Sequence, residues 1–549
     1  MTVSWLAGIT RSYTDDDFIA SDCTCCLDRR GARRLPGKLV LMLPVEIQQL
    51  VRKRATKFGH GSLKLMKLRS LKNIILILAA GTTACGGGGG GNGSGGSTVT
   101  VPPTSATPPP PPPPASTTCS LSSRQNFAFS VINEHYLFPE TLPTSLNPEP
   151  FSTVQAYIDA LVATARGQGR DRFFTFVTSI AEENAFFSSG STAGFGVRFA
   201  YQGNRLFVTE AFEGAPALSS GIDRGTEILA IGTSTSNLVT VADILASQGA
   251  NGVTTALGPS TAGTSRVLRI ADASGTRDVN ITKSDFIISP LSSRYGVKVI
   301  DNNGQRVGYI NMRTFISTAN DQLRTAFADF RAQGITNFVI DFRYNGGGLV
   351  STAELMGDLL GGNRFSSDVF SVTRFRPSKS ANNETKRFVI QPQSVSPVKI
   401  AFISTKATAS ASELVMNAFV PFLGANTALV GSNSFGKPVG QIAVDQAACD
   451  DRIRVVAFAK DNAAGQGDYF SGLAGNFKAT CAAADDITRP LGDPQEASLR
   501  TALDFVAGRS CTPVAVGQTT QSSSSRNERL MLPLPRDPNT AQREVPGAF

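Results

Sequence analysis

The sequence predicts a multidomain α/β protein in which a helical N-terminal segment and a β-rich domain precede an α/β core. The length of 549 residues exceeds what one hydrophobic core usually organises, so several domains are expected. From residue 285, apolar strands such as NFVIDFR and VKIAFIS alternate with helical patterns such as QLRTAFADFRAQG. This alternation is typical of a largely buried sheet covered by helices. We therefore assign residues 285–510 to the α/β core.

Two other patterns come before this core. In residues 119–188, SSRQNFAFSVINEHY and TVQAYIDALVATARG carry apolar residues at three-to-four spacing, which predicts helices. In residues 189–284, short strands punctuated by glycine predict a β-rich domain, with TVADILA as a short helix. The final segment, residues 511–549, is polar and contains QSSSSR and scattered prolines, so we expect it to be disordered.

The basic charge of the chain is confined to its N-terminal part. The net charge is +9, but residues 1–84 hold 14 Lys and Arg against 6 Asp and Glu, while the remainder holds 38 against 37. The body of the protein therefore lacks the basic surface that nucleic-acid binding requires. Its 41% hydrophobic and 17% charged residues are those of an ordinary globular protein.

Residues 66–84 have the three regions of a secretory signal peptide. A basic stretch, KLRSLKN, is followed by the apolar IILILAA, which is too short to span a bilayer, and then by small residues ahead of Cys85. The last part resembles the lipobox of bacterial lipoproteins, which implies that Cys85 is lipidated and anchors the chain. Plain secretion with an incidental cysteine is the alternative. In bacterial lipoproteins an aspartate directly after the lipidated cysteine is a signal for retention in the inner membrane. Gly86 occupies this position here, so we expect the protein to be anchored in the outer membrane.

The segments on either side of this signal differ in composition. Residues 85–118 combine a glycine run with seven consecutive prolines, which reach roughly 22 Å as polyproline II, and together they predict a tether. Residues 1–65 are basic and have no clean periodicity, whereas a signal normally begins within a few residues of the start. We therefore interpret Met66 as the initiator and residues 1–65 as an over-extended reading frame.

Four cysteines lie in the predicted folded part, and disulfides are plausible in an exported protein. We favour Cys449–Cys481, because these residues flank one polar insertion, and Cys119–Cys511, because these lie near the two ends of the folded part. The only CxxC spacing lies in residues 23–26 and has no second pair, which argues against a zinc site.

The stretch TASASE, residues 408–413, stands between two apolar runs. Ser410 and Glu413 have the S-x-x-E spacing of a helix capping box. The same hydroxyl could be a nucleophile, because a helix N-terminus stabilises negative charge that develops beside it. Apart from one histidine in the doubtful extension, His135 is the only histidine, and it lies in a predicted helix. A Ser-His-Asp triad is therefore disfavoured, and a Ser-Lys pair is the known alternative.

The candidate base is Lys437, in SFGKPVGQ. Burial can bring the pKa of a catalytic lysine to about 7–8, although a lysine in a surface turn would fit this stretch equally well. A third motif, VIDFRYNGGG in residues 339–348, ends a buried strand in three glycines, whose N–H groups can point at a bound oxygen. No GK[ST] follows, so a phosphate-binding P-loop is excluded.

VIDFRYNGGG, TASASELV and GKPVGQ, in this order, resemble the S41 serine peptidases, the tail-specific or C-terminal processing peptidases. The resemblance covers roughly residues 120–510 and implies an α/β peptidase core of the tail-specific protease type. It implies that Ser410 is the nucleophile, with Ser412 as a rival because the repeat permits a shift of two residues.

The same resemblance implies the roles of the other site residues. Lys437 would be the base, and Gln441 would orient it. The oxyanion would be held by the backbone N–H groups of Ala411 and of one glycine of the loop, Gly347.

A second resemblance precedes these motifs. GFGV, EGAPA and GIDRGTEILAIG, in residues 194–232, resemble a PDZ domain, which places a PDZ-like domain at residues 189–284. The resemblance implies that N–H groups of the first motif capture the C-terminus of a peptide beside an exposed strand edge. The implied peptide-binding residues are Gly194, Phe195, Gly196 and Val197.

The sequence thus predicts an exported serine endopeptidase that cleaves protein or peptide substrates through a Ser-Lys dyad. Its PDZ-like domain would recognise substrate C-termini, Cys85 would attach it to the outer membrane of a bacterial envelope, facing the periplasm or the surface, and no cofactor or metal is expected. The sequence specifies no adaptor. One alternative is a catalytically inert, PDZ-containing peptide-binding lipoprotein. Another is a structural lipoprotein associated with peptidoglycan, suggested by the anchor and the spacer.

We predict that the unprocessed precursor begins at Met66, because a signal peptide works from the start of the chain. N-terminal sequencing of precursor accumulated without processing checks this. Peptides derived from residues 1–65 would contradict it.

Overall fold

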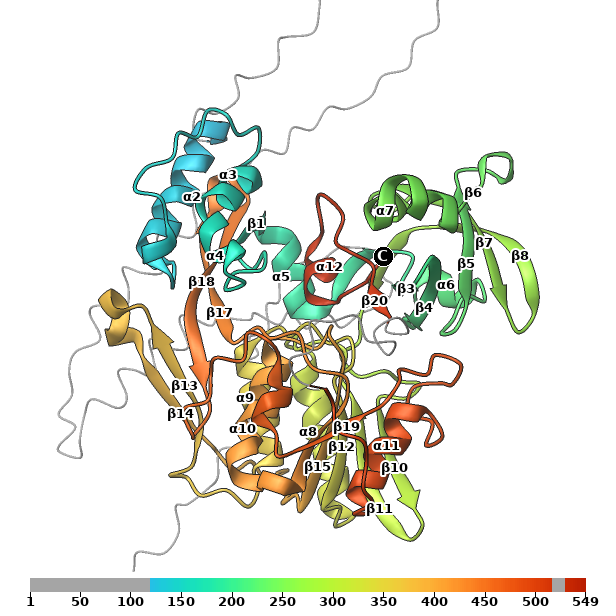
Figure 1. Ribbon diagram of the computed structural model, residues 1–549, viewed down its shortest axis with the longest axis vertical. Coiled ribbons are helices and arrows are strands. Elements are labelled where there is room, and N and C mark those ends of the chain that lie inside the picture. The colour runs from blue at the N-terminus through green and yellow to red at the C-terminus, as the bar shows by residue number, and fades with distance from the viewer. Residues whose placement is uncertain (1–118, 516–528) are drawn as a thin grey trace, which may run out of the picture. The chain divides into compact units, whose positions relative to one another are not determined.

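The computed structural model describes residues 119–515 and 529–549 (Figure 1). The predicted extension (1–65), signal peptide (66–84), anchor at Cys85 and tether (85–118) lie outside the described residues. Among the residues that are described, no helix is both long enough and apolar enough to cross a membrane.

The α/β core is built on a six-stranded sheet in the order β10-β11-β12-β15-β16-β19. The first two strands form an antiparallel hairpin, and each of the following neighbours pairs in parallel. The strands are β10 (Val297–Asn302), β11 (Gln305–Asn311), β12 (Asn337–Asp341), β15 (Lys399–Ser404), β16 (Thr427–Gly431) and β19 (Ala479–Ala482). The parallel strands end at one edge of the sheet, where loops can bring polar residues together.

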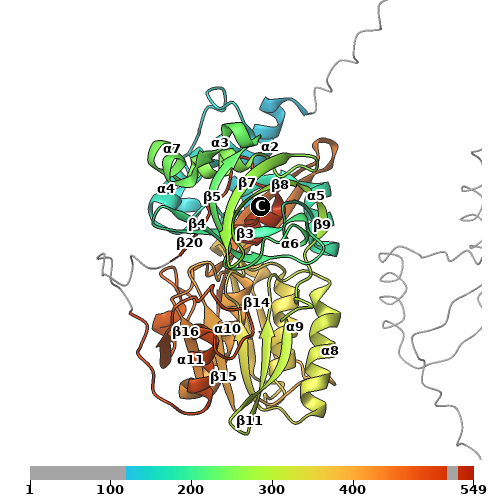
Figure 2. The ribbon, with the colours of Figure 1, turned by 90° about the vertical axis from the view of Figure 1, so that its right-hand side faces the viewer.

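Helices cover both faces of this sheet because successive residues of each strand point to opposite sides. In β12, Phe338 and Ile340 pack in the hydrophobic cluster that contains α8, α9 and α10, whereas Val339 packs in the cluster that contains α11. Figure 2 shows α8 and α9 on the side of the sheet opposite to α11. The helices are α8 (Ala319–Ala332), α9 (Val350–Leu360), α10 (Ala411–Leu423) and α11 (Ala497–Val506). The predicted α/β class is confirmed.

The predicted helical segment shares an antiparallel sheet with the core. Its one strand pairs with β18, which also pairs with β13 and β17. The helices are α2 (Leu121–His135), α3 (Val154–Leu161), α4 (Ala163–Gly167) and α5 (Ile180–Ser189). The strands are β1 (Phe176–Ser179), β13 (Val369–Phe375), β14 (Glu384–Arg387), β17 (Val439–Gln446) and β18 (Asp451–Asp461). Residues far apart in sequence therefore build one layer.

The predicted β-rich region forms a sheet in the order β20-β3-β4-β5-β7-β8, with β6 paired to β5, and a separate pair of β2 and β9. The strands are β2 (Ser191–Gly194), β3 (Val197–Gln202), β4 (Arg205–Ala211), β5 (Glu227–Gly232), β6 (Val239–Thr240), β7 (Ser265–Asp272), β8 (Gly275–Thr282) and β9 (Ser284–Ile287). The helices are α6 (Pro216–Ser219) and α7 (Val241–Leu257).

The expectation that residues 511–549 are disordered is wrong for residues 529–549. This stretch contains β20 (Leu530–Met531), which pairs with β3, and α12 (Thr540–Glu544). It is ordered because Leu532, Val545 and Phe549 are nearly fully buried, which offsets the conformational entropy lost on ordering. The expectation rested on the polar QSSSSR stretch and gave no weight to these few apolar residues. QSSSSR lies among residues 516–528, outside the described part of the chain.

The favoured disulfide pairing is also wrong. The structure joins Cys119 to Cys449 and Cys481 to Cys511, with Cα–Cα distances of 5.4 and 5.3 Å. Cys481 lies in β19 and is held inside the core by parallel pairing with β16, while the chain after α11 returns beside it through a bond from Ala482 N to Thr512 O. Sheet register, which the spacing of cysteines does not reveal, decides the pairing.

We predict that replacing both Cys481 and Cys511 with Ser lowers the free energy of unfolding by about 2–4 kcal/mol, because the bridge restricts the unfolded chain. Urea titration of the oxidised and variant proteins measures this. Mass spectrometry of a non-reduced digest should give peptides that link these two residues, and a Cys449–Cys481 peptide would contradict the structure.

Candidate active site

Ser410 lies at the start of α10, just after the loop that follows β15. Its φ of 56° and ψ of −115° are unusual for a residue other than glycine, and such strain is retained where the surroundings over-determine it. Two hydrogen bonds hold the main chain just before Ser410 in place: Ala409 N donates to Asn345 O (3.0 Å), and Thr408 Oγ1 donates to Phe342 O (2.8 Å). The result is a partly exposed hydroxyl at a helix N-terminus.

The rival serine has a different environment. Ser412 is fully buried, and its Oγ donates to Asn345 O (3.2 Å), a main-chain group just before the three glycines of the loop. A fully buried hydroxyl that already bonds a carbonyl is not accessible to a substrate in this structure. The geometry therefore favours Ser410 over Ser412 as a nucleophile.

Glu413 joins the start of α10 to the loop that carries Lys437. Its Oε2 accepts from Ser410 N (2.9 Å) and Lys437 N (2.8 Å), and its Oε1 from Ser434 Oγ (2.6 Å) and Gly436 N (2.7 Å). The side chain is fully buried, and this burial raises the pKa of Glu413, while the four donors act in the opposite direction. Two loops separated by a helix and a strand are thus held on one carboxylate.

Lys437 lies between β16 and β17 and is held at both ends. Its Nζ donates to Gln441 Oε1 (2.9 Å), and Gln441 Nε2 donates to Phe174 O (2.5 Å), while Nζ lies 4.7 Å from the centre of the Phe174 ring. Burial lowers the pKa of Lys437 below its ordinary value. The predicted pairing of this lysine with Gln441 is therefore present, and the amine is in the environment that a general base needs.

The predicted oxyanion residues converge on Ser410. A Cβ placed on Gly347, whose φ is +120°, would lie 2.7 Å from Ser410 Cβ and 3.1 Å from Ala411 N, so glycine is required at this approach. The Ala411 N–H is in the first turn of α10, where amides have no intrahelical acceptor. The Gly347 N–H donates to Asn345 Oδ1 (2.9 Å) and must exchange this bond before it can hold an oxyanion.

The remaining predicted residues lie elsewhere. Gly194 ends β2 and Val197 begins β3, and the N–H groups of Gly196 and Val197 donate to the main-chain oxygen of Phe549. Phe195 is buried in the hydrophobic cluster of the β-rich region. His135 ends α2, and the charged groups that influence it are Lys379, Glu134 and Arg376, so it is not part of the serine site.

Sequence reasoning missed three residues of this site. Asn345, fully buried, accepts from Gly347 N and donates through Nδ2 to Met312 O (2.8 Å). Arg172 donates to Phe435 O (2.9 Å) and covers the Phe435 ring beside Lys437. Glu413 was identified as a cap only. The sequence did contain a signal for Asn345, because it is a polar residue in a glycine loop directly after a buried strand. It contained no such signal for Arg172, which comes from the distant helical segment.

Comparisons with known proteins agree with this geometry. Residues 306–466 match the model of peptidase family S41. A carboxyl-terminal-processing protease of Picosynechococcus sp. is 27% identical over 257 residues, which are 46% of this chain and 55% of that protein. A chloroplastic C-terminal processing peptidase of Tetradesmus obliquus is 25% identical over 280 residues, which are 47% of this chain and 54% of that protein. These matches support the S41 peptidase family.

The chain spans about half the length of these curated relatives. A crystal structure of a putative S41 protease from Bacteroides fragilis superposes with a TM-score of 0.55 at 22% identity, covering 70% of this chain and 97% of that one. At this identity the likeness shows the fold, and it agrees with the multidomain α/β architecture. The family match spans Asn345, Ser410, Glu413 and Lys437.

We predict that Glu413→Gln lowers the free energy of unfolding by about 1–3 kcal/mol, because one carboxylate oxygen is replaced by an amide NH₂ group that faces two donors. Any peptidase activity should fall about 10²-fold, because displacing the loop by about 1 Å misplaces the reacting groups. Urea titration and cleavage rates measure these effects. Glu384→Gln, on an exposed strand, is the matched control, and equal behaviour of the two variants would contradict the role of Glu413.

Proposed function

We propose that this protein is an exported serine endopeptidase of the carboxyl-terminal processing type, with Ser410 as nucleophile and Lys437 as general base. The observation that carries the proposal is the convergence of the two loops on Glu413, which brings a strained, partly exposed serine and a lysine of lowered pKa to one carboxylate. The supporting comparison is the match of residues 306–466 to the S41 peptidases.

The chemistry follows from the named groups. Neutral Lys437 takes the proton of the Ser410 hydroxyl as its oxygen attacks the carbonyl carbon of a peptide bond. The N–H groups of Ala411 and, once released by Asn345, of Gly347 hold the oxyanion, helped by the N-terminus of α10. Lys437 then returns its proton to the leaving amine. Water, deprotonated by neutral Lys437, then attacks the acyl carbon, and the proton passes from Lys437 to the Ser410 oxygen as the ester bond breaks and the acid product leaves.

The other parts of the chain have roles in the same proposal. Gly194–Val197 receive the C-terminus of a substrate at the edge of β3, as in a PDZ-like domain. Residues 66–84 export the chain, and lipid on Cys85 attaches it to the membrane, with the Gly/Pro-rich tether as a spacer. Gln441 fixes the direction of the Lys437 amine through its bond to Nζ.

We predict that the chain from residue 119 onward cleaves unfolded β-casein and that Ser410→Ala abolishes cleavage. Lys437→Ala should lower the rate about 10²–10⁴-fold, the usual contribution of a general base. Ser412→Ala is the matched control and should retain cleavage, because its hydroxyl only bonds Asn345 O. Gel analysis of casein fragments measures all four rates. Undiminished cleavage by both Ser410→Ala and Lys437→Ala would overturn the dyad, and no cleavage by any form would favour an inert peptide-binding protein.

We also predict that kcat/KM rises with pH through the pKa of Lys437, because only the neutral amine accepts the proton of Ser410. Burial lowers this pKa, and Arg454 acts in the same direction, while Glu544, Asp171 and Glu413 oppose it, so the acid limb should lie below the ordinary lysine value of about 10.4. Casein cleavage from pH 5 to 10 measures the limb. A profile that is flat over this range would argue against a titrating lysine.

A further inference from the structure

The last residues of this sequence, which we call the added strand, run antiparallel along the edge of β3 and pair with it through an isolated bridge. Phe549 N donates to Val197 O (2.9 Å), Gly196 N to Phe549 O (2.9 Å), and Phe199 N to Gly547 O (2.8 Å), and Ala548 pairs antiparallel with Arg198. Farther along the same edge, β20 pairs with β3. The edge that would receive an extended peptide by strand addition is therefore occupied by residues of the same chain.

The side chain of Phe549 fills an aromatic pocket. It is 4% exposed and belongs to the same buried cluster as Phe195 and Phe199, with its ring centre 6.2 Å from that of Phe199. The Nζ of buried Lys283 lies 5.8 Å from the Phe549 ring and 4.7 Å from the Phe195 ring, an arrangement in which a cation favours aromatic faces. The pocket thus favours a peptide whose last side chain is aromatic.

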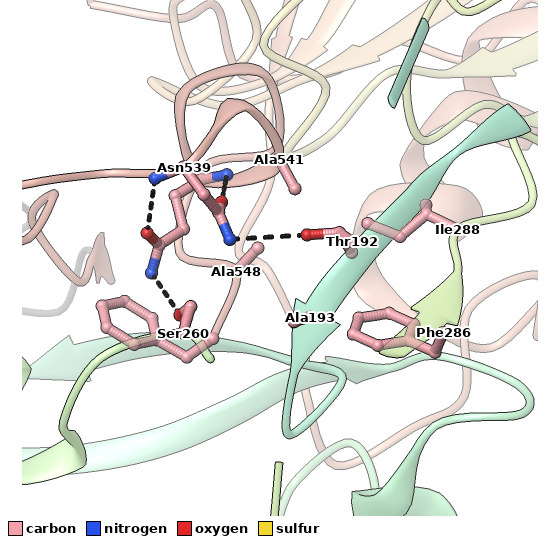
Figure 3. Close-up of a pocket in the computed structure, with 10 residues that line it drawn as sticks. Thr192, Ala193, Ser260, Phe286, Ile288, Asn539, Ala541 and Ala548 are labelled. Carbon is pink, nitrogen blue, oxygen red and sulfur yellow. Dashed lines mark hydrogen bonds between the residues drawn. The ribbon is translucent and has the colours of Figure 1, made fainter. Parts of the chain in front are cut away.

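A second set of contacts holds the segment ahead of this strand. Asn539 and Gln542 cap α12 reciprocally, and their remaining amide donors reach outward, Asn539 Nδ2 to Thr192 Oγ1 (3.4 Å) and Gln542 Nε2 to Ser260 Oγ (3.0 Å). Figure 3 shows these bonds between the C-terminal segment and the β-rich region. These bonds hold the segment that precedes Pro546 against the β-rich region.

Between α12 and the added strand, the chain passes over the glycine loop of the serine site. A Cβ placed on Gly346 would lie 2.6 Å from Glu544 O and 3.0 Å from Pro546 Cδ, so the two main chains are in direct contact. Arg198 Nη1 donates both to Tyr344 O (2.7 Å) and to Pro546 O (3.4 Å). The Glu544 carboxylate is also the anion that most strongly opposes the lowering of the Lys437 pKa by burial.

We propose that Pro546–Phe549 are a resident ligand of the β3 edge, held by the pocket of Phe195, Phe199 and Lys283, and that they compete there with peptides that carry an aromatic side chain at the position of Phe549. A substrate of this class must displace the resident segment to reach the glycine loop. This last step rests on the proposed peptidase function, whereas the binding site does not.

A resident segment is a strong competitor because it is part of the same chain. Its effective concentration can reach the millimolar range, and a free peptide binds only the fraction of molecules in which the edge is open. Weakening the resident segment should therefore raise the apparent affinity for a free peptide without any change in the pocket. The same change should uncover the glycine loop.

The full chain offers a variant that releases the segment and a matched control. Gly547 has a φ of +77°, and a Cβ there would lie 2.5 Å from Phe199 O, so Gly547→Val is incompatible with the added strand. Leu534 belongs to the same segment but is 40% exposed, so Leu534→Asp should leave the strand in place. Both are made in Ser410→Ala protein to prevent cleavage of the probe.

The probe is a fluorescent peptide of residues 543–549, REVPGAF, with a free carboxyl end, and fluorescence anisotropy measures its binding. We expect Gly547→Val to bind it at least tenfold more tightly than Ser410→Ala alone or with Leu534→Asp. Replacing the last residue of the probe by serine should weaken binding to Gly547→Val about tenfold or more, because the buried ring is lost. Equal affinity for all three proteins, or no binding by Gly547→Val while its circular dichroism is unchanged, would overturn the proposal.

A second readout tests the displacement step. With Ser410 present, Gly547→Val should raise kcat/KM for β-casein severalfold over the unchanged chain and over Leu534→Asp, and an equal or lower value would overturn displacement. If the probe binds as expected but no form of the chain cleaves casein, the peptide site stands and the proposed peptidase function fails. If cleavage occurs but the probe affinities are equal, the reverse holds.

Discussion

The geometry of the candidate site depends on one buried carboxylate. Glu413 accepts four hydrogen bonds. One comes from the Ser410 amide at the start of α10, and three come from the loop that carries Lys437: the amides of Gly436 and Lys437 and the hydroxyl of Ser434. A fully buried carboxylate is stable only when its oxygens are satisfied, so neither loop can move away without leaving a charge unpaired. This constraint holds the main chains of Ser410 and Lys437, which come from separate loops, on one carboxylate before any substrate arrives, as the preorganised site of the proposed function requires.

A second constraint acts on the glycine loop. Tyr344 has a φ of 64°, and the Arg198 guanidinium donates to its carbonyl oxygen while the Arg224 guanidinium donates to its hydroxyl. Such strain costs of order 1–3 kcal/mol, and the buried charges around the loop hold it in place. Arg198 also pairs with Glu210, which pairs with Arg313 of the core, so the β-rich region and the glycine loop share one buried network. The Arg198 guanidinium thus bonds both the glycine loop, at Tyr344 O, and the segment on the β3 edge, at Pro546 O.

Much of the fold and part of the site could be predicted. The α/β core and the helical and β-rich segments before it were expected from apolar periodicity, and the bond between Lys437 and Gln441 was implied by the resemblance to the S41 peptidases. The disulfides were wrong because pairing depends on which strands become neighbours. Order in residues 529–549 was missed because its few apolar residues pack against segments, such as β3 and α5, that lie more than three hundred positions earlier in the sequence.

The sequence by itself determined the local parts of this protein: a serine at a helix start, a lysine between a glycine and a proline, and a glycine loop at the end of a buried strand. Each depends on residues within one or two turns of chain, where propensity and spacing act directly. The tertiary structure alone decided that Glu413 clamps the first two together, that Asn345 holds the Gly347 amide, and that the final strand covers β3. These outcomes require burial, which depends on contacts between segments whose separation in sequence carries no information about their distance in the fold.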